Sequence, residues 1–515
     1  MYRIGIDVGG TNTDAVLMNG DEVVHAVKTA TSADVMAGVL AVLRQVISGS
    51  GVRAADLRAV MIGTTHFTNA IVERRALARV GVIRLALPAT QSLPPLSGWP
   101  EDIAAAVRAD AHIVSGGFEF DGREIGPVVA AEIQAAADSF AANRIRHVAI
   151  SGVFSLINDA QERQAAQLLR DALPGVRVTL SSEVGRVGLL ERENAAILNA
   201  ALGDLGQAIM DAFSSAVAQA GIDAPFFLTQ NDGTLMSAAR AARFPILTVA
   251  SGPTNSMRGA AFLSKEQDAI VVDIGGTTSD VGVLQKGFPR AAGTAVEVGG
   301  VRTNFRMPDV FSFGLGGGSL VVDDPKGVTV GPRSVGYRLT TEALVFGGST
   351  LTTSDIVVAA GRAIVGDPKK VAGLDPGLIA RTEARIADML EAAVERSRLS
   401  PEPLPVIVVG GGSILVKGRI AGLEAIKPHH FAVANAVGAA IAQVSGETDR
   451  VYSLAAISRA DAIKDAEEKA RASAVAAGAR EDSLQVVDVE DVPLAYLPGN
   501  ATRVHVKVVG DLHVA

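Results

Sequence analysis

Two short segments of the sequence combine acidic, glycine and hydroxyl residues in nearly the same order. Residues 6–14 read Ile-Asp-Val-Gly-Gly-Thr-Asn-Thr-Asp, and residues 272–280 read Val-Asp-Ile-Gly-Gly-Thr-Thr-Ser-Asp, 266 residues later. In each copy a carboxylate ends an apolar run, two glycines leave backbone N–H groups open to an anion, and hydroxyls follow. One such turn is more often only a hairpin. Two copies flanked by aspartates predict a pair of phosphate-binding turns in two related domains.

A third glycine turn follows an apolar run late in the chain. Residues 406–413 read Val-Ile-Val-Val-Gly-Gly-Gly-Ser, a buried strand whose glycine end allows the backbone to approach a base or ribose. Many α/β strands end in this way, so this turn, taken alone, is explained equally well as an ordinary strand end that binds no ligand. None of the three turns has the G-x-x-x-x-G-K-[ST] or G-x-G-x-x-G spacing, which disfavours P-loop and dinucleotide sites.

Two polar turns are candidates for contacts to a substrate. Thr64, Thr65 and Asn69 follow a predicted buried strand at 59–62, at the strand end where ligands enter α/β sheets. Residues 316–319 are expected to form the opposite wall. The alternative is that Thr64 and Asn69 only cap a helix that begins near Asn69.

The composition excludes several classes of protein. The chain of 515 residues has no cysteine, which excludes disulfides, thiol nucleophiles, cysteine-ligated zinc and iron–sulfur clusters. Its 47 basic and 55 acidic residues give a net charge of −8, so the basic footprint of a nucleic-acid binder is missing. The start of the chain lacks a signal-peptide pattern, and no stretch approaches 18 apolar residues. We expect a cytoplasmic protein with no nucleic-acid or membrane partner.

The apolar periodicity predicts alternating helices and strands, which is typical of an α/β fold with a covered, largely parallel sheet. Helices are expected at 34–48, 128–143, 159–173, 191–220, 251–263, 353–365 and 376–397. Strands are expected at 15–18, 59–62, 79–87, 148–153, 247–249, 281–284 and 406–409. The last part of the chain predicts strands at 451–455, 484–489 and 503–509 around a helix at 461–477, with Gly499 and Asn500 turning the chain between the last two strands.

Several motifs occur in an order that narrows the interpretation. Residues 63–74, 251–253, 273–281 and 314–319 together resemble the hydantoinase/oxoprolinase family, in particular its A-type, ATP-binding subunit. The resemblance extends from Ile4 to about Val444, and the paired hairpins also resemble those of the actin-like ATPase superfamily. It implies two duplicated actin-like (ribonuclease H-like) ATPase lobes around a nucleotide cleft, with a small C-terminal α+β domain. The expected divisions are 1–190, 191–265, 266–449 and 450–515.

The resemblance also implies an activity. Members of the family use ATP to open a cyclic amide such as a hydantoin, 5-oxoproline or a related lactam or imide, by phosphorylating the ring carbonyl oxygen. A B-type or other partner subunit and an oligomer are implied as well. The alternatives are a small-molecule kinase, an acetone-carboxylase-like activating subunit, a nucleotide-driven reactivase of a partner enzyme, or a degenerate member that only binds ATP. The absence of cysteine excludes the cluster-bearing activators of this superfamily.

The resemblance assigns roles to individual residues, with ATP and Mg²⁺ as cofactors. Asp7 and Asp273 are expected to face Mg²⁺ through water and, with Thr11 and Thr277, to form the catalytic set. The expected cofactor-binding residues are Gly9, Gly10, Thr11, Asn12, Thr13, Gly275, Gly276, Thr277, Thr278, Gly316, Gly317, Gly410, Gly411, Gly412 and Ser413. The expected substrate-binding residues are Thr64, Thr65, Asn69, Gly318 and Ser319. Phe311 stands where many relatives carry a histidine that could bind a metal, which disfavours a second metal site.

Overall fold

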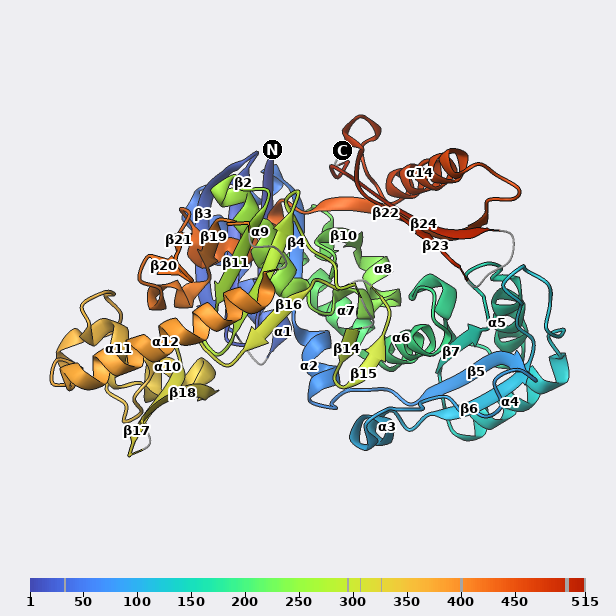
Figure 1. The fold of residues 1–515 in the computed structure, drawn as a ribbon, viewed down its shortest axis with the longest axis horizontal. Coiled ribbons are helices and arrows are strands. Elements are labelled where there is room, and N and C mark those ends of the chain that lie inside the picture. Colours follow the sequence, from blue (N-terminus) through green and yellow to red (C-terminus); the bar gives the residue numbers. More distant parts are fainter. Residues whose placement is uncertain are drawn as a thin grey trace.

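The computed structural model describes residues 1–31, 34–293, 296–305, 307–325, 327–398, 402–495 and 500–513. Figure 1 shows its elements. The helices are α1 (Val35–Ser50), α2 (His66–Val72), α3 (Glu101–Val107), α4 (Ala130–Ala142), α5 (Ala160–Ala172), α6 (Leu189–Ala201), α7 (Gly203–Gln219), α8 (Ala238–Arg243), α9 (Ser251–Ser264), α10 (Leu339–Glu342), α11 (Thr353–Ala359), α12 (Pro376–Ser397), α13 (Ala434–Ala440) and α14 (Arg459–Ala476). The strands are β1 (Tyr2–Val8), β2 (Asn12–Asn19), β3 (Glu22–Ala30), β4 (Leu57–Thr64), β5 (Val80–Leu87), β6 (Asp110–Ser115), β7 (His147–Gly152), β8 (Arg177–Leu180), β9 (Phe226–Thr229), β10 (Thr234–Ser237), β11 (Ala269–Ile274), β12 (Ser279–Gln285), β13 (Phe288–Pro289), β14 (Val296–Val298), β15 (Val301–Thr303), β16 (Val310–Phe313), β17 (Ser319–Asp324), β18 (Gly327–Ser334), β19 (Val406–Val409), β20 (Arg419–Ile420), β21 (Leu423–Ile426), β22 (Gln443–Ser453), β23 (Gln485–Pro493) and β24 (Ala501–Gly510).

The two sequence copies form equivalent hairpins in two different sheets. One sheet has the order β23-β24-β22-β10-β9-β4-β1-β2-β3, and the other contains β13-β12-β11-β19-β21-β20 with β16 beside β12. Asp7 lies opposite Asp14 in the first hairpin, and Asp273 lies opposite Asp280 in the second. Each hairpin is joined by a parallel strand, β4 in one sheet and β19 in the other. The repeat in the sequence is therefore a repeat of a structural unit.

Helices α9 and α13 cross at very short distance. A Cβ atom built on Gly259 would lie 1.8 Å from the carbonyl oxygen of Ala434, and one built on Gly438 would lie 1.8 Å from that of Asn255. Helix α13 also approaches β1, because a Cβ on Gly5 would lie 2.1 Å from the Ala436 carbonyl oxygen. Only glycine permits backbones to pack this closely, so these positions fix how the two helices sit against the first sheet.

Two further units extend from the central sheets (Figure 1). A parallel sheet with the order β6-β5-β7-β8 has its own apolar core with α4 and α5, which includes Ile83, Phe140 and Leu169. The β17–β18 hairpin lies near α10, α11 and α12 at the opposite end of the molecule. Both units leave the β1–β2 and β11–β12 hairpins in the middle of the structure.

The C-terminal strands continue the nine-stranded sheet. Strand β22 pairs in parallel with β10 at its start and antiparallel with β24 along its length. Helix α14 packs on this sheet through an alanine at every fourth position, and a Cβ on Gly446 would lie 2.1 Å from the Ala470 carbonyl oxygen. These alanines are Ala462, Ala466, Ala470 and Ala474. The expected division between 449 and 450 falls inside β22, and the division of the chain into domains stays a prediction.

Most of the expected elements are confirmed, and the helix at 376–397 and the strand at 406–409 have the expected bounds. The strand expected at 247–249 is wrong, because Pro245–Thr248 form a 3₁₀ turn in which Leu247 N–H donates to the Phe244 carbonyl. The expected helix at 191–220 is two helices that meet near Gly203, where a Cβ would lie 2.4 Å from the His147 ring. The helix expected at 353–365 ends at Ala359. Gly499 lies outside the described residues.

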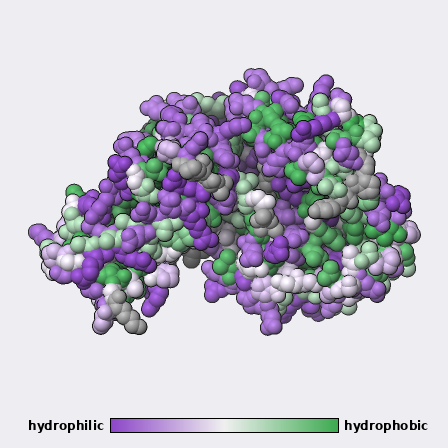
Figure 2. Space-filling model, in the orientation of Figure 1, coloured by the Kyte–Doolittle hydropathy of each residue, from purple (hydrophilic) through white to green (hydrophobic). Residues whose placement is uncertain are grey.

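The helices and one face of the surface can be compared with what a membrane span requires. Within the part of the chain that the structure describes, no helix is both long and apolar enough to cross a bilayer. Figure 2 shows hydrophilic residues over most of the visible face, interrupted by smaller hydrophobic patches.

Candidate functional site

The two hairpins face each other across a cavity of about 610 Å³, here termed the hairpin cleft. A Cβ atom on Gly276 would lie 3.5 Å from Cγ2 of Thr11, so the two glycine turns are in van der Waals reach. The third glycine turn closes one side, because a Cβ on Gly410 would lie 2.2 Å from Oδ1 of Asp273. The predicted residues that line the cleft are Asp7, Gly9, Gly10, Thr11, Asn12, Asp273, Gly275, Gly276, Thr277, Thr278, Gly317, Gly410, Gly411 and Gly412.

Three predicted cofactor residues do not line the cleft and instead support its turns. The Thr13 hydroxyl is buried and lies 3.2 Å from that of Thr31. The Ser413 hydroxyl donates to the Gly410 carbonyl at 2.5 Å. A Cβ on Gly316 would lie 2.5 Å from the Gly276 carbonyl carbon, so this glycine packs against the second hairpin from behind. Their contribution in this structure is to the shape of the glycine turns.

The predicted substrate residues at 64–69 also lie outside the wall of the cleft. Helix α2 begins at His66, three residues earlier than expected, and Asn69 is exposed on its surface. The Thr64 hydroxyl is buried 2.6 Å from Nδ1 of His66, and the Thr65 hydroxyl donates to the Val8 carbonyl at 3.3 Å. Because Thr64 lies opposite Val8 in the β1–β4 pair, this turn is next to Asp7 even though it does not face the cavity.

The other two predicted substrate residues, Gly318 and Ser319, form hydrogen bonds with backbone groups. Gly318 N–H donates to the Gly276 carbonyl at 2.7 Å, and the buried Ser319 hydroxyl accepts from Gly316 N–H at 2.9 Å. These contacts tie the 316–319 turn to the second hairpin. Within this group of residues, Gly317 alone belongs to the wall of the cleft.

The charges in the cleft wall are three carboxylates and one amine. Burial raises the pKa of Asp7 to about 6, and the neighbouring charge of Asp14 adds to the effect. Burial also raises the pKa of Asp273. Lys28 contacts Asp14 at 2.6 Å and donates to the Ala432 carbonyl at 3.2 Å. Because one cation faces three acidic groups, the wall has an excess of negative charge that a divalent cation would offset.

The side chains of the cleft suit a metal ion that takes most of its ligands from water and phosphate and few from side chains. Among the described residues, no group of three or more histidine, aspartate or glutamate side chains is arranged to hold a metal ion. Mg²⁺ commonly uses one or two carboxylates, several waters and the phosphates of its substrate. Asp7 and Asp273, one from each hairpin, fit that role.

Several residues of the cleft were missed by the sequence reasoning. Asp14 is the last residue of the first repeat, and its partner Lys28 lies directly opposite it in the β2–β3 pair. The register of this hairpin could therefore have indicated both residues. Ser256 and Asn435 come from helices α9 and α13. Ser256 stands three residues after the 251–253 motif, whereas no motif lies next to Asn435. Other unpredicted wall residues are Gly336, Tyr337, Leu339, Ser354, Val365, Ile414 and Ala432.

Phe311 lies on β16, beside the second hairpin. Its ring stacks on Phe313 with centroids 5.7 Å apart, and the Arg396 guanidinium lies 4.1 Å above it. The Phe311 ring thus belongs to the packing beside the second hairpin, and the absence of a second metal site stays a prediction.

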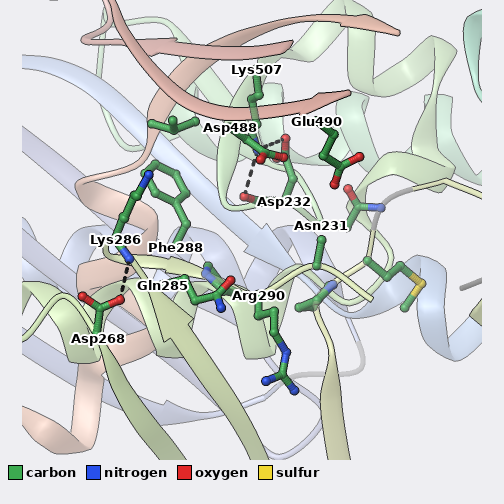
Figure 3. A pocket seen from close by; sticks show the side chains of 15 residues that line it. Asn231, Asp232, Asp268, Gln285, Lys286, Phe288, Arg290, Asp488, Glu490 and Lys507 are labelled. Carbon is green, nitrogen blue, oxygen red and sulfur yellow. Dashed lines mark hydrogen bonds and ion pairs between the residues drawn. The ribbon is translucent and has the colours of Figure 1, made fainter. Parts of the chain in front are cut away.

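A second cavity of about 480 Å³ lies at the other end of β11, between the β12–β13 turn and the C-terminal strands. Figure 3 shows its charged wall, in which Lys507 contacts Asp232 at 2.6 Å. The Arg258 guanidinium lies 3.8 Å from the centroid of the Phe288 ring, and the Lys507 amine lies 5.7 Å from it. It shares no wall residue with the hairpin cleft, so it is a separate feature of the molecule.

Comparison with known families agrees with this geometry. Residues 3–173 match the hydantoinase/oxoprolinase N-terminal region, and residues 192–367 match hydantoinase/oxoprolinase. The chain belongs to the hydantoinase/oxoprolinase family. Both repeat hairpins lie within the matched segments.

Individual relatives cover different shares of this family member. Caprolactamase subunit alpha of Pseudomonas jessenii is 28% identical over 471 residues, which are 85% of this chain and 65% of that protein. Acetophenone carboxylase gamma subunit of Aromatoleum aromaticum is 24% identical over 392 residues, which are 69% of this chain and 53% of that protein. The chain thus spans less than two thirds of the length of these curated relatives.

Solved structures show the same fold. The ATP-dependent caprolactamase from Pseudomonas jessenii superposes with a TM-score of 0.79 at 19% identity, covering 99% of this chain and 88% of that chain. A nucleotide-free acetone carboxylase gives 0.70 at 18% identity, with 99% and 88% covered. At these identities the likeness concerns the α/β fold alone.

Proposed function

We propose that this chain is the ATP-binding subunit of an enzyme that opens a cyclic amide. The observation that carries the proposal is the convergence of three separate glycine turns on one cleft, with Asp7 and Asp273 at its floor. Such a cleft presents backbone N–H groups and hydroxyls to phosphates from two sides. The named relatives, a caprolactamase and an acetophenone carboxylase subunit, support the choice of an ATP-dependent reaction at a carbonyl group.

The reaction needs ATP because an amide carbonyl is a poor electrophile. The ring carbonyl oxygen attacks the γ-phosphorus, the bond from that phosphorus to ADP breaks, and the activated ring carbon accepts water. Loss of phosphate and cleavage of the C–N bond, with a proton passing to nitrogen, then give an open-chain product with a carboxylate and a released N–H group. Mg²⁺, when bound, neutralises charge on the phosphates. Phosphoryl transfer depends mainly on positioning and charge stabilisation.

The residues of the hairpin cleft divide these tasks in our proposal. The glycine turns at 9–10 and 275–276, with the hydroxyls of Thr11 and Thr277, bind and orient the phosphates. Asp7 and Asp273 hold the hydrated cation, and residues 410–412 hold the adenosine. The substrate role of Thr64, Thr65, Asn69, Gly318 and Ser319 stays a prediction that depends on a rearrangement, because these residues do not face the cavity in this structure.

An ATPase assay with a panel of hydantoins, lactams and cyclic imides tests the proposal, with the chain alone and with a co-expressed B-type subunit. We expect ATP turnover and ring opening to be stimulated by at least one cyclic amide. Asp273→Asn should reduce turnover by about 100-fold or more while the circular dichroism spectrum is unchanged. Absence of ligand-stimulated turnover in both preparations would contradict the proposal.

Three alternatives give different results in the same assay. A small-molecule kinase releases a stable phosphorylated product, and a carboxylase subunit requires bicarbonate, an option that the acetophenone carboxylase relative supports. A reactivase hydrolyses ATP in response to a partner protein and to no small molecule. That the relatives are named as subunits supports a partner chain for this protein as well.

A further inference from the structure

A side chain of α9 contacts one of the two carboxylates that line the hairpin cleft. Nδ2 of Asn255 donates to Oδ1 of Asp7 over a long 3.5 Å and to Oγ1 of Thr229 at 3.0 Å. The next residue, Ser256, lines the same cleft as Asp273. Helix α9 therefore contacts the carboxylate of the first hairpin directly.

A second amide holds Asp7 from the opposite side. Nδ2 of Asn435, on α13, donates to Oδ2 of Asp7 at 2.9 Å, while its own Oδ1 accepts from the N–H of Ala436 at 2.9 Å. Each oxygen of the Asp7 carboxylate thus accepts from one asparagine, and the two donors come from different helices. Two such contacts fix the plane of the carboxylate as well as its position.

Glycines make room for this arrangement. A Cβ on Gly63 would lie 2.4 Å from Nδ2 of Asn255 and 2.6 Å from Oδ1 of Asp7. A Cβ on Gly438 would lie 1.8 Å from the carbonyl oxygen of Asn255. Any side chain at either position would separate the amide from the carboxylate, so the close helix crossing is what brings the contact about.

The surroundings of the Asn255 amide oxygen are evidence against a purely structural role for this residue. Its Oδ1 atom is fully buried and has no hydrogen-bond partner in the described part of the chain. A buried acceptor without a partner lowers stability, and such a group calls for a functional or chemical explanation. The contribution that remains is the donation from Nδ2 toward Asp7 and Thr229.

We propose that Asn255 and Asn435 are positioning residues that together form an amide clamp on Asp7. The clamp aims the Asp7 carboxylate at the divalent cation of a bound nucleotide. This inference rests on the proposed function, since it takes Asp7 and Asp273 to hold the cation.

Binding of Mn²⁺ to the protein in the presence of ADP, followed by electron paramagnetic resonance, tests the clamp without any turnover. Asn255→Ala and Asn435→Ala should each weaken Mn²⁺ binding by about tenfold, as is typical when residues that orient a metal ligand are removed. The double variant should lose less Mn²⁺ affinity than the product of the two single-variant factors, because both amides act on one carboxylate. The affinity for ADP without metal should stay within about twofold.

Asn199→Ala is the matched control. Asn199 is equally buried, lies on α6, and donates to Thr179 and to the Arg243 carbonyl, both at 3.0 Å. It should reduce the melting temperature at least as much as Asn255→Ala and leave Mn²⁺ binding unchanged.

Unchanged Mn²⁺ affinity in both asparagine variants would overturn the clamp and leave the proposed function standing. If Asn199→Ala weakened Mn²⁺ binding equally, the clamp would also be overturned, because the loss of affinity would then follow from lost stability. A wild-type protein that binds no Mn²⁺ with ADP would overturn the clamp and the proposed nucleotide site together. If no lactam stimulated ATP turnover while both asparagine variants weakened Mn²⁺ binding as expected, only the proposed substrate would be contradicted.

Discussion

Asp280 is the second-hairpin counterpart of Asp14, but it has a different partner. Asp14 contacts the Lys28 amine, whereas Asp280 accepts from the Ser312 hydroxyl opposite it on β16. Burial raises the pKa of Asp280 to about 6, and the charge of Asp273 contributes to the increase. The proton on Asp280 is therefore held more tightly in the folded chain than in the unfolded one.

This difference predicts a pH-dependent stability. A carboxyl group whose pKa rises on folding destabilises the protein once the pH exceeds its unfolded value, and the full penalty is reached above its folded value of about 6. At 1.36 kcal/mol per pKa unit the penalty reaches about 3 kcal/mol. Asp280→Asn keeps an acceptor for Ser312 and should raise the melting temperature of the nucleotide-free protein at pH 8. Near pH 4 it should have little effect.

Thermal denaturation followed by circular dichroism at both pH values measures this effect. Asp56→Asn is the control, because the Asp56 side chain is 37% exposed and its pKa is lowered by Arg53. It should give no gain at pH 8. A gain for Asp280→Asn that is equal at both pH values would show that the charge of Asp280 is not its cause.

At the scale of elements, the crossing of α9 and α13 decides where Asn255 and Asn435 lie. Gly438→Ala places a methyl group in the position occupied by the Asn255 carbonyl oxygen. We expect a loss of about 3 kcal/mol or more in the free energy of unfolding, since overpacking against backbone is not relieved by a rotamer change. Urea denaturation measures the loss.

Gly373→Ala is the matched control for this substitution. A Cβ at residue 373 would meet no atom within 4 Å, so its unfolding free energy should stay within about 0.5 kcal/mol of the wild type. If Gly438→Ala behaved like Gly373→Ala, the two helices would not be in the close contact described here.

At the scale of the whole molecule, the C-terminal segment completes the nine-stranded sheet. Val504, Val506 and Val508 of β24 share one core with Met61 of β4 and Leu235 of β10. A chain that ends at residue 449 would cut β22 and expose this core. We expect such a truncated chain to be insoluble or to melt well below the full-length protein.

Soluble yield and a melting curve of the 1–449 chain measure this dependence. A truncated chain that melts at the temperature of the full-length protein would show instead that residues 450–515 form a separable domain. That outcome would support the division expected from the sequence.

The sequence by itself determined the local parts of the site. The repeated Asp-x-Gly-Gly-Thr pattern predicted both hairpins, and alternation of apolar runs predicted most helices and strands, because turn chemistry and periodicity are local properties. The sequence failed for some elements. The expected long helix is divided into α6 and α7 near Gly203, which lies against the ring of the distant His147, and the 247–249 run follows Pro245 into a 3₁₀ turn.

Only the tertiary structure decided which of these parts work together. Asp7 and Asn435 are 428 positions apart, yet their side chains lie 2.9 Å from each other, because α13 packs directly on β1. The contact of Asn255 with Asp7 likewise depends on glycines at 63 and 438, whose importance is a matter of space and not of motif. Side chains that act by orienting another residue carry no periodic or compositional signal, so the sequence revealed the carboxylates and the fold revealed what holds them.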